Sequence, residues 1–192
     1  MPPRTVHVKA KVCLAGQRAV GKTSLLRRFD LDVFEEGYTA TLGARISKKG
    51  LNLEFPEEDL RVRMDMTIWD IVGDRDVVQL LGEAYYHGAQ GILAVCDVTR
   101  QETLEEIPGW RDLIVRRTGR IPWVLAANKV DLAEEAVVQE AEVQTVAEAL
   151  PAPLLPTSAK TGQRVQEAFE LLGRRIAASG SVGGRRMSQQ SF

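Results

Sequence analysis

The stretch Gly16-Gln17-Arg18-Ala19-Val20-Gly21-Lys22-Thr23 has the spacing G-x4-G-K-[ST] of a phosphate-binding loop. It follows an apolar stretch and precedes the leucine-bearing start of a helix, which is the context that the motif requires. Backbone N–H groups of such a loop and the positive end of the helix form a pocket for nucleotide phosphates. Lys22 would reach the β- and γ-phosphate oxygens, and the Thr23 hydroxyl would hold Mg²⁺. The predicted phosphate-binding residues are Gly16, Gln17, Arg18, Ala19, Val20, Gly21, Lys22, Thr23 and Ser24.

A second motif identifies the base, because a phosphate loop alone does not separate an ATPase, a kinase and a GTPase. Asn128-Lys129-Val130-Asp131 follows the apolar run 121–127, so we expect it to leave a buried strand at the same sheet edge as the phosphate loop. The Asp131 carboxylate can accept hydrogen bonds from N1–H and the exocyclic amine of guanine. Adenine would leave that carboxylate without a donor, so the site would strongly prefer guanine over adenine. The motif therefore predicts a guanine nucleotide.

Three further segments complete a resemblance to a known family. They are Ile68-Trp69-Asp70-Ile71-Val72-Gly73, residues 34–43, and Thr157-Ser158-Ala159-Lys160. Together with the first two motifs, they make the chain similar to a small GTPase of the Ras superfamily. Their sequences resemble those of the Rab branch. The similarity extends from about residue 6 to residue 177. It implies GTP or GDP as bound nucleotide and Mg²⁺ as cofactor.

The resemblance also implies roles for single residues. Asp70 would touch Mg²⁺ through water, and the Gly73 N–H would contact the γ-phosphate. Thr41 would sense both Mg²⁺ and the γ-phosphate, Phe34 would pack edge-on to the guanine, and the Ala159 N–H would contact its O6. The implied metal ligands are thus Thr23, Thr41 and, through water, Asp70. The residues implied on the guanine side are Phe34, Asn128, Lys129, Asp131, Ser158, Ala159 and Lys160.

One departure from the family concerns the residue after Gly73. The family has there the Gln that orients the attacking water, and this chain has Asp74. Aspartate is shorter, cannot donate a hydrogen bond when ionised, and brings negative charge toward the γ-phosphate. We therefore expect slow intrinsic hydrolysis, unless Asp74 is a solvated loop residue that points away. The implied catalytic residues are Lys22, Thr41, Gly73, Asp74 and Arg18.

A second departure is Arg18, at a loop position that is Gly in Ras and often Ser in Rab-like relatives. Its guanidinium could point to solvent, pair with Asp74, or lean toward the γ-phosphate as an arginine finger supplied in cis. A long side chain here would crowd an arginine from an activating partner. The segment between Thr41 and Trp69 is also longer than in a typical Rab, so the family's effectors cannot be carried over.

The alternation of strand and helix patterns predicts the fold class. Residues 6–15 are expected as the first strand, residues 22–29 as the first helix, and residues 51–68 as a hairpin. We expect an α/β protein with a single P-loop GTPase domain over residues 1–178. Its six-stranded, mostly parallel sheet would have one antiparallel edge strand and helices on both faces. Residues 179–192, poor in apolar side chains, would form a flexible tail.

Composition limits the partners and the compartment. The 192 residues include 25 Lys and Arg against 26 Asp and Glu, so the net charge of −1 predicts no attraction to nucleic acid or to a membrane surface. Cys13 and Cys96 lie in apolar runs, which indicates reduced core residues and a cytoplasmic location. There is no cysteine after Cys96 and no Gly at position 2, so no lipid anchor is expected.

Three functions remain open at this point. The leading hypothesis is a GTP-hydrolysing switch whose loops order around Mg²⁺ and the γ-phosphate, and which works with effector, exchange and activating proteins. The second is a GTP-binding scaffold or pseudo-GTPase with negligible intrinsic hydrolysis. The third is an ATP-using phosphoryl transferase that shares only the phosphate loop, and Thr41, Asn128 and Asp131 argue against it.

Overall fold

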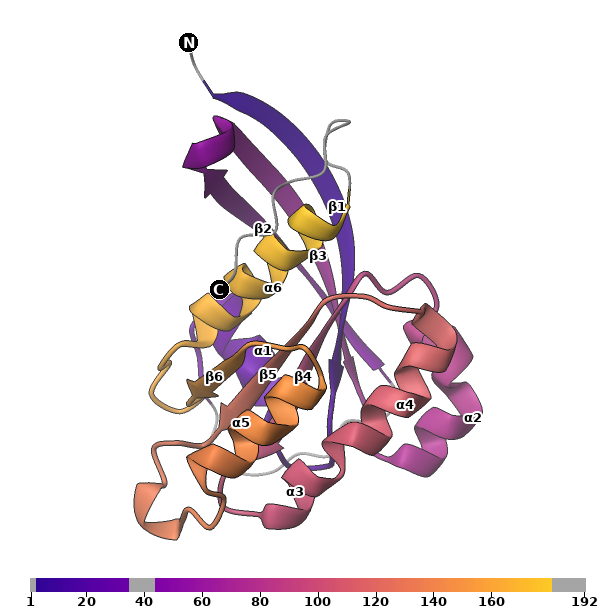
Figure 1. The fold of residues 1–192 in the computed structure, drawn as a ribbon, viewed down its shortest axis with the longest axis vertical. Coiled ribbons are helices and arrows are strands. Elements are labelled where there is room, and N and C mark those ends of the chain that lie inside the picture. Colours follow the sequence, from indigo (N-terminus) through magenta and orange to yellow (C-terminus); the bar gives the residue numbers. More distant parts are fainter. Residues whose placement is uncertain (1–2, 35–43, 181–192) are drawn as a thin grey trace.

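A six-stranded sheet in the order β2-β3-β1-β4-β5-β6 forms the centre of the protein (Figure 1). The computed structural model describes residues 3–34 and 44–180. The strands are β1 (Arg4–Ala15), β2 (Ala44–Phe55), β3 (Leu60–Ile71), β4 (Gly91–Asp97), β5 (Trp123–Asn128) and β6 (Leu154–Thr157). The edge strand β2 pairs with β3 in antiparallel fashion, and all other neighbouring strands are parallel. The predicted mostly parallel sheet with one antiparallel edge strand is confirmed.

Helices cover both faces of the sheet, as predicted (Figure 1). They are α1 (Lys22–Leu31), α2 (Arg75–Tyr86), α3 (Gln101–Glu105), α4 (Ile107–Thr118), α5 (Glu140–Ala149) and α6 (Val165–Ser179). Helices α1 and α6 share one core, in which the rings of Phe29 and Phe169 stack with centroids 4.0 Å apart. Helices α2 to α5 share the second core, which contains Trp110 and Tyr86.

Strand β4 supplies both cores, because its successive side chains point to opposite faces. Ile92, Ala94 and Cys96 belong to the core under α2 to α5, whereas Leu93 and Val95 belong to the core under α1 and α6. All seven residues of β4 are buried, as expected for the middle of a parallel sheet.

Both cysteines are buried and free, as the sequence predicted. Burial raises the pKa of each thiol to about 12, so Cys13 and Cys96 are protonated and unreactive near neutral pH.

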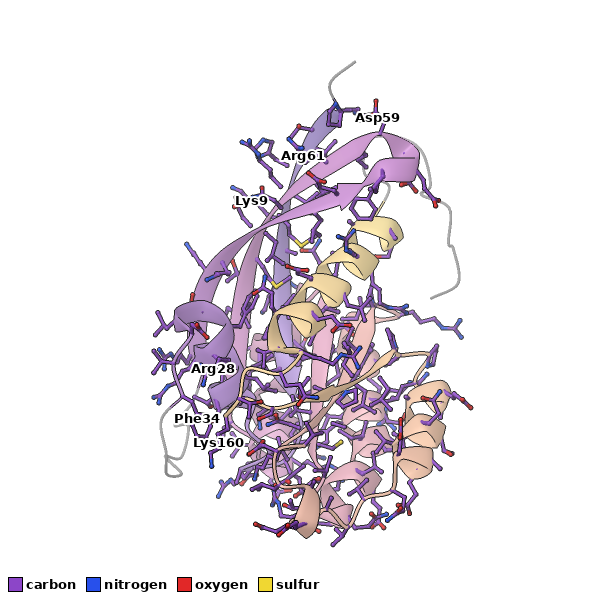
Figure 2. All side chains as sticks on the ribbon, turned by 90° about the vertical axis from the view of Figure 1, so that its left-hand side faces the viewer. Lys9, Arg28, Phe34, Asp59, Arg61 and Lys160 are labelled. Atoms are coloured by element: carbon purple, nitrogen blue, oxygen red, sulfur yellow. The ribbon has the colours of Figure 1, made fainter. Side chains whose placement is uncertain are left out.

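The first three strands extend beyond the rest of the sheet. Pairing between β1 and β3 begins at Arg4 and Leu60, whereas β4 joins β1 only at Val12. A short 3₁₀ turn at Pro56–Glu58 closes the β2–β3 hairpin. Figure 2 shows Lys9 and Arg61 on the face of these long strands that points away from α6. The extension begins two residues before the predicted first strand, because pairing with β3 defines where β1 starts.

Two expectations concern the chain end and membranes. Helix α6 runs to Ser179, one residue past the predicted end of the domain at residue 178. Residues 181–192, which make up most of the predicted tail, lie outside the described part, so the flexible tail stays a prediction. Among the described helices, none is long and apolar enough to cross a membrane.

Candidate nucleotide-binding site

The phosphate loop connects the end of β1 at Ala15 to the start of α1 at Lys22. Its two motif glycines have positive φ angles, 132° at Gly16 and 99° at Gly21, which are costly for any side chain. A Cβ atom at Gly16 would collide with the carbonyl oxygen of Val95, and one at Gly21 would collide with the amide of Asn128. Glycine is therefore required at both positions by backbone conformation and by close packing.

Lys22 lies inside the loop and is only 7% exposed. Its Nζ donates hydrogen bonds of 2.8 Å to the carbonyl oxygens of Gly16 and Gln17. Burial lowers its pKa to about 8, the charge of Asp70 opposes this shift, and the nearby Arg100 adds to it. The loop therefore holds a desolvated ammonium group that gains from an anionic partner.

Gly73 packs directly against the phosphate loop. A Cβ atom at this position would collide with the Lys22 Nζ and would lie 2.6 Å from the Arg18 backbone nitrogen. The segment between β3 and α2 thus touches the loop at the ammonium group predicted to bind the β- and γ-phosphates.

A threonine and a carboxylate converge beside Lys22. The Thr23 hydroxyl donates a hydrogen bond of 2.6 Å to Oδ2 of Asp70, which is fully buried at the end of β3. Burial raises the pKa of Asp70, while the hydrogen bond from Thr23 and the charge of Lys22 lower it. The other oxygen, Oδ1, is buried and has no hydrogen-bond partner among residues 3–34 and 44–180.

These groups fit the implied Mg²⁺ site. A buried carboxylate oxygen without a partner is unfavourable unless a cation or its bound water compensates it. Residues 3–34 and 44–180 contain no cluster of three or more His, Cys, Asp or Glu side chains that could hold a metal. Mg²⁺ is commonly held by one or two protein side chains together with phosphate oxygens, and Thr23 and Asp70 beside the phosphate loop match that pattern. Thr41, the other implied ligand, lies outside the described residues.

Asn128 joins the phosphate loop to the predicted guanine-binding loops. Its side chain is 1% exposed, and its Nδ2 donates a hydrogen bond of 2.9 Å to the carbonyl oxygen of Val20. Its Oδ1 accepts hydrogen bonds of 3.3 Å from the Thr157 hydroxyl and from the Ala159 N–H. One amide thus holds three loops in a common arrangement.

Asp131 is oriented by the last of these loops. Ser158 Oγ donates a hydrogen bond of 2.5 Å to Asp131 Oδ1, and Ser158 Oγ itself accepts from the Thr161 N–H at 3.0 Å. Arg28 of α1 supports the same loop by donating to the carbonyl oxygens of Ala159 at 2.9 Å and Lys160 at 2.7 Å. Figure 2 shows Phe34, Arg28 and Lys160 near one another at the left side of the lower half of the view, and Phe34 is partly buried against the core.

An ionic cluster around Asp97 was missed by the sequence analysis. The carboxylate is fully buried and lies 2.5 Å from Lys129 Nζ and 3.0 Å from Arg100 Nε. Burial favours the neutral acid, but hydrogen bonds from Lys129, Thr99 and Arg100 hold the pKa of Asp97 below its ordinary value. Arg100 also donates a hydrogen bond of 2.9 Å to the Arg18 carbonyl oxygen. The available signal was the position of Asp97 at the carboxyl end of a buried strand.

The structure decides among the alternatives for Arg18 and Asp74. Arg18 Nη2 lies 2.6 Å from Asp74 Oδ2, although the Arg18 side chain remains 60% exposed. Asp74 Oδ1 caps the N-terminus of α2, since it accepts from the N–H groups of Asp76 at 3.0 Å and Val77 at 3.2 Å. The ion pair, one of the three alternatives for Arg18, is therefore present, and Asp74 caps a helix, whereas a role of either residue in hydrolysis stays a prediction.

Comparison with known proteins agrees with this fold. The phosphate loop, the guanine-type loop and the Thr–Asp pair lie at one edge of a P-loop α/β sheet, and the chain belongs to the Ras family, whose sequence model matches residues 11–178. Its relatives include Rab and Ypt proteins, so it is a Rab-like, nucleotide-binding small GTPase, which confirms the resemblance stated from the sequence.

Three of these relatives are similar to the chain over most of its length. The Ras-related protein Rab-21 of Geodia cydonium is 34% identical over 174 residues, covering 90% of this chain and 73% of the relative. The Ypt/Rab-type GTPase YPT7 of Saccharomyces cerevisiae is 35% identical over 171 residues, or 85% and 79% of the two chains. The GTP-binding protein ypt1 of Schizosaccharomyces pombe is 33% identical over 167 residues, or 86% and 79%.

Proposed function

We propose that this protein is a GTP-binding molecular switch that hydrolyses GTP to GDP, slowly when no partner protein is present. The observation that carries the proposal is the Asn128 side chain, whose hydrogen bonds join the phosphate loop to both guanine-side loops. Groups suited to phosphates and groups suited to guanine are thereby held in one fixed arrangement. A single guanine nucleotide that spans both is the ligand that fits it.

The phosphate end of the site binds through charge. The buried Lys22 ammonium would pair with β- and γ-phosphate oxygens in place of the two carbonyl oxygens that it now contacts. Thr23, Asp70 through water, and Thr41 would hold Mg²⁺, which when bound neutralises phosphate charge. The orphaned Oδ1 of Asp70 supports this assignment.

The guanine end of the site selects the base. Ser158 holds Asp131 through Oδ1, and Oδ2 accepts no hydrogen bond from the described residues. That oxygen is available to N1–H and the amine of guanine, whereas adenine would leave a carboxylate without donors. Ala159, whose N–H now bonds Asn128, lies in the same loop and would approach O6 of the base.

The link between nucleotide and conformation is the segment from Gly73 to Asp74. Gly73 packs against Lys22, and the next residue, Asp74, caps α2, so a γ-phosphate contact at Gly73 would act directly on the start of that helix. Gain or loss of the γ-phosphate would therefore change a surface available to effector, exchange and activating proteins.

Slow hydrolysis follows from the contacts of Asp74. One carboxylate oxygen caps α2 and the other pairs with Arg18, so the carboxylate is held in place and part of its capacity to accept a hydrogen bond from an attacking water is already used. The same pair keeps the Arg18 guanidinium from acting as a finger on the γ-phosphate. This geometry also favours the second candidate, a GTP-binding scaffold with negligible hydrolysis.

Two measurements test these proposals. Competition of GTP and ATP against a fluorescent GDP analogue should show strong preference for GTP, and equal competition would rule out a guanine site. Single-turnover hydrolysis with Mg²⁺ separates the switch from the scaffold. Slow but Mg²⁺-dependent release of phosphate supports the switch, and a rate equal to that of free GTP supports the scaffold.

We also propose a cytoplasmic location for the protein. The free, buried cysteines support this proposal, because reduced thiols are typical of that compartment.

A further inference from the structure

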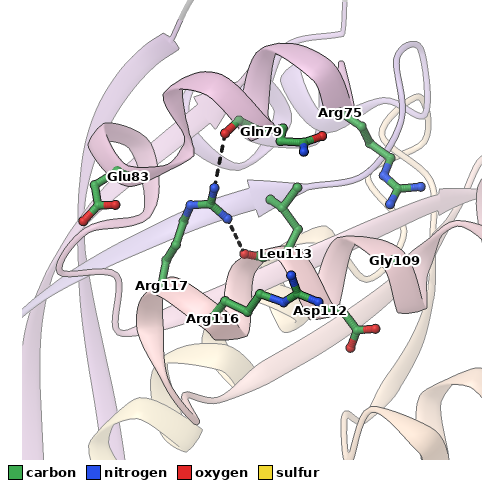
Figure 3. A pocket seen from close by; sticks show the side chains of 8 residues that line it. All are labelled: Arg75, Gln79, Glu83, Gly109, Asp112, Leu113, Arg116 and Arg117. Atoms are coloured by element: carbon green, nitrogen blue, oxygen red, sulfur yellow. Dashed lines mark hydrogen bonds between the residues drawn. The ribbon is translucent and has the colours of Figure 1, made fainter.

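A groove of about 470 Å³ lies between α2 and α4 (Figure 3). Its walls include Arg75, Gln79 and Glu83 on α2, and Leu113, Arg116 and Arg117 on α4. None of these residues belongs to the nucleotide site described above. The groove therefore requires a separate explanation.

Arg117 holds the two helices together. Its guanidinium donates hydrogen bonds to the carbonyl oxygens of Leu113 on its own helix, at 2.7 Å, and of Gln79 on α2, at 3.2 Å (Figure 3). Gly82 makes room for this crossing, since a Cβ atom there would lie 3.0 Å from Arg117 Nε. The hydrogen bonds of the Arg117 guanidinium therefore already serve to hold the two helices together.

Arg75 and Arg116, in contrast, do not hold the helices together. Both side chains are exposed, and neither forms an ion pair or a hydrogen bond with another residue in the described part of the chain. Asp112, an acidic residue of the groove, lies 3.6 Å from Arg111. Two guanidinium groups on different helices are therefore available to anions, and a guanidinium matches a carboxylate with two parallel hydrogen bonds.

The groove also has an apolar wall. Leu113 of α4 lines it, between the charged side chains of the two helices. An apolar side chain beside charged groups is typical of surfaces that bind other proteins. A polypeptide can offer carboxylates and apolar side chains at the same time, whereas a small inorganic anion offers charge alone.

We propose that the groove between α2 and α4 binds an acidic segment of a partner protein, with carboxylates of that segment at Arg75 and Arg116. Glu83 lies at the end of the groove far from Arg75 (Figure 3). It disfavours acidic side chains there and gives the bound segment a direction.

The test uses the full chain and a fluorescein-labelled hexaglutamate peptide, with hexaglutamine as the neutral control peptide. Fluorescence anisotropy should show saturable binding of hexaglutamate alone. The double variant Arg75→Ser/Arg116→Ser should weaken binding by about tenfold or more, because it removes two charge-assisted contacts. The matched control is Lys48→Ser/Arg63→Ser, which removes two exposed cations from β2 and β3 and should bind as the parent does. Equal loss in both double variants would overturn the proposal, as would absence of binding by the parent.

A second variant moves the Arg75 guanidinium without changing any charge. A Cβ atom at Gly109 would lie 2.8 Å from Arg75 Nη2, which is the far end of a flexible side chain and can shift without unfolding the helix. Gly109→Ala should therefore weaken peptide binding severalfold at unchanged helix content by circular dichroism. Gly50→Ala is its control, because nothing lies within 4 Å of that position. Parent-like binding by Gly109→Ala would overturn the placement of a carboxylate at Arg75.

Two other occupants are distinguished in the same assay. Displacement of the peptide by inorganic phosphate at equal concentration would show a simple anion site and overturn the proposal. Analytical ultracentrifugation tests for a second copy of the chain. A dimer that forms without peptide and dissociates in the Arg75→Ser/Arg116→Ser variant would also overturn it.

Discussion

Arg18 Nη2 and Asp74 Oδ2 lie 2.6 Å apart, so an ion pair connects the phosphate loop to the residue that caps α2. The two residues are separated by 56 positions in the chain. The contact places both departures from the family pattern in one interaction. We therefore expect GTP hydrolysis to depend on the two residues together.

Replacing the capping residue separates its two possible effects. Asp74→Gln removes a good helix cap and should lower the free energy of unfolding by about 1 kcal/mol. It should also raise the rate of single-turnover GTP hydrolysis roughly tenfold, or about 1.4 kcal/mol of barrier, because glutamine can both donate to and accept from a water. Asp76→Gln, an exposed change in the same helical turn, should alter neither quantity by as much. Unchanged hydrolysis in Asp74→Gln would place this position outside the mechanism.

The ion pair itself should be weak but functional. Because Arg18 is 60% exposed, a double-mutant cycle with Arg18→Ala and Asp74→Ala should give a coupling energy of only about 0.2–1 kcal/mol in urea unfolding. In hydrolysis assays, Arg18→Gly should slow the reaction or weaken GTP relative to GDP, because Asp74 then stands uncompensated beside the phosphate. Strictly additive effects on hydrolysis would show that the pair has no functional role.

Replacing one carboxylate oxygen of Asp131 with an amide nitrogen should change which purine base the protein prefers. Asp131→Asn replaces an acceptor with a donor where xanthine has a carbonyl and guanine an amine, so preference should shift from GTP toward XTP. Competition of both nucleotides against labelled GDP measures the shift. Glu134→Gln, an exposed carboxylate in the following turn, serves as the control. An unchanged preference for GTP would contradict the assignment of Asp131 as the residue that recognises guanine.

The lowered pKa of Lys22 predicts a pH dependence of nucleotide binding. In the free protein the pKa is about 8, and bound phosphate charge would raise it, so binding takes up a proton when the pH exceeds 8. Affinity for GDP should therefore be constant below pH 8 and should fall above it, by up to about tenfold per pH unit. Lys22→Arg keeps its charge and controls for titration of the base. A parent curve parallel to that of Lys22→Arg would contradict the prediction.

Loss of the Asn128 amide should destabilise the protein even without nucleotide. Asn128→Ala leaves the Val20 carbonyl and the Ala159 N–H without their partner in a buried place, which should cost about 2 kcal/mol or more. Urea unfolding of the nucleotide-free protein measures the effect. Asn52→Ala, at an exposed position of β2, should change the unfolding free energy much less. Equal changes in the two variants would mean that Asn128 does not hold the loops together.

The sequence by itself determined the fold class and the motifs of the site. Strand alternation, helical periodicity and motif spacing are local properties, which the backbone converts into elements without reference to distant residues. This is why the first strand, the first helix that follows the glycine-containing loop, and the β2–β3 hairpin were predicted correctly.

Only the tertiary structure decided which distant side chains meet. The sequence left three orientations open for Arg18, because a long exposed arginine has many rotamers. Its contact with Asp74 depends on where α2 begins. The bonds from Arg100 to Asp97 and Arg18, and those from Asn128 to Val20 and Ala159, likewise join loops from different strands. Such contacts exist only after the parallel strands bring their carboxyl ends to one edge, and no local pattern encodes their distances.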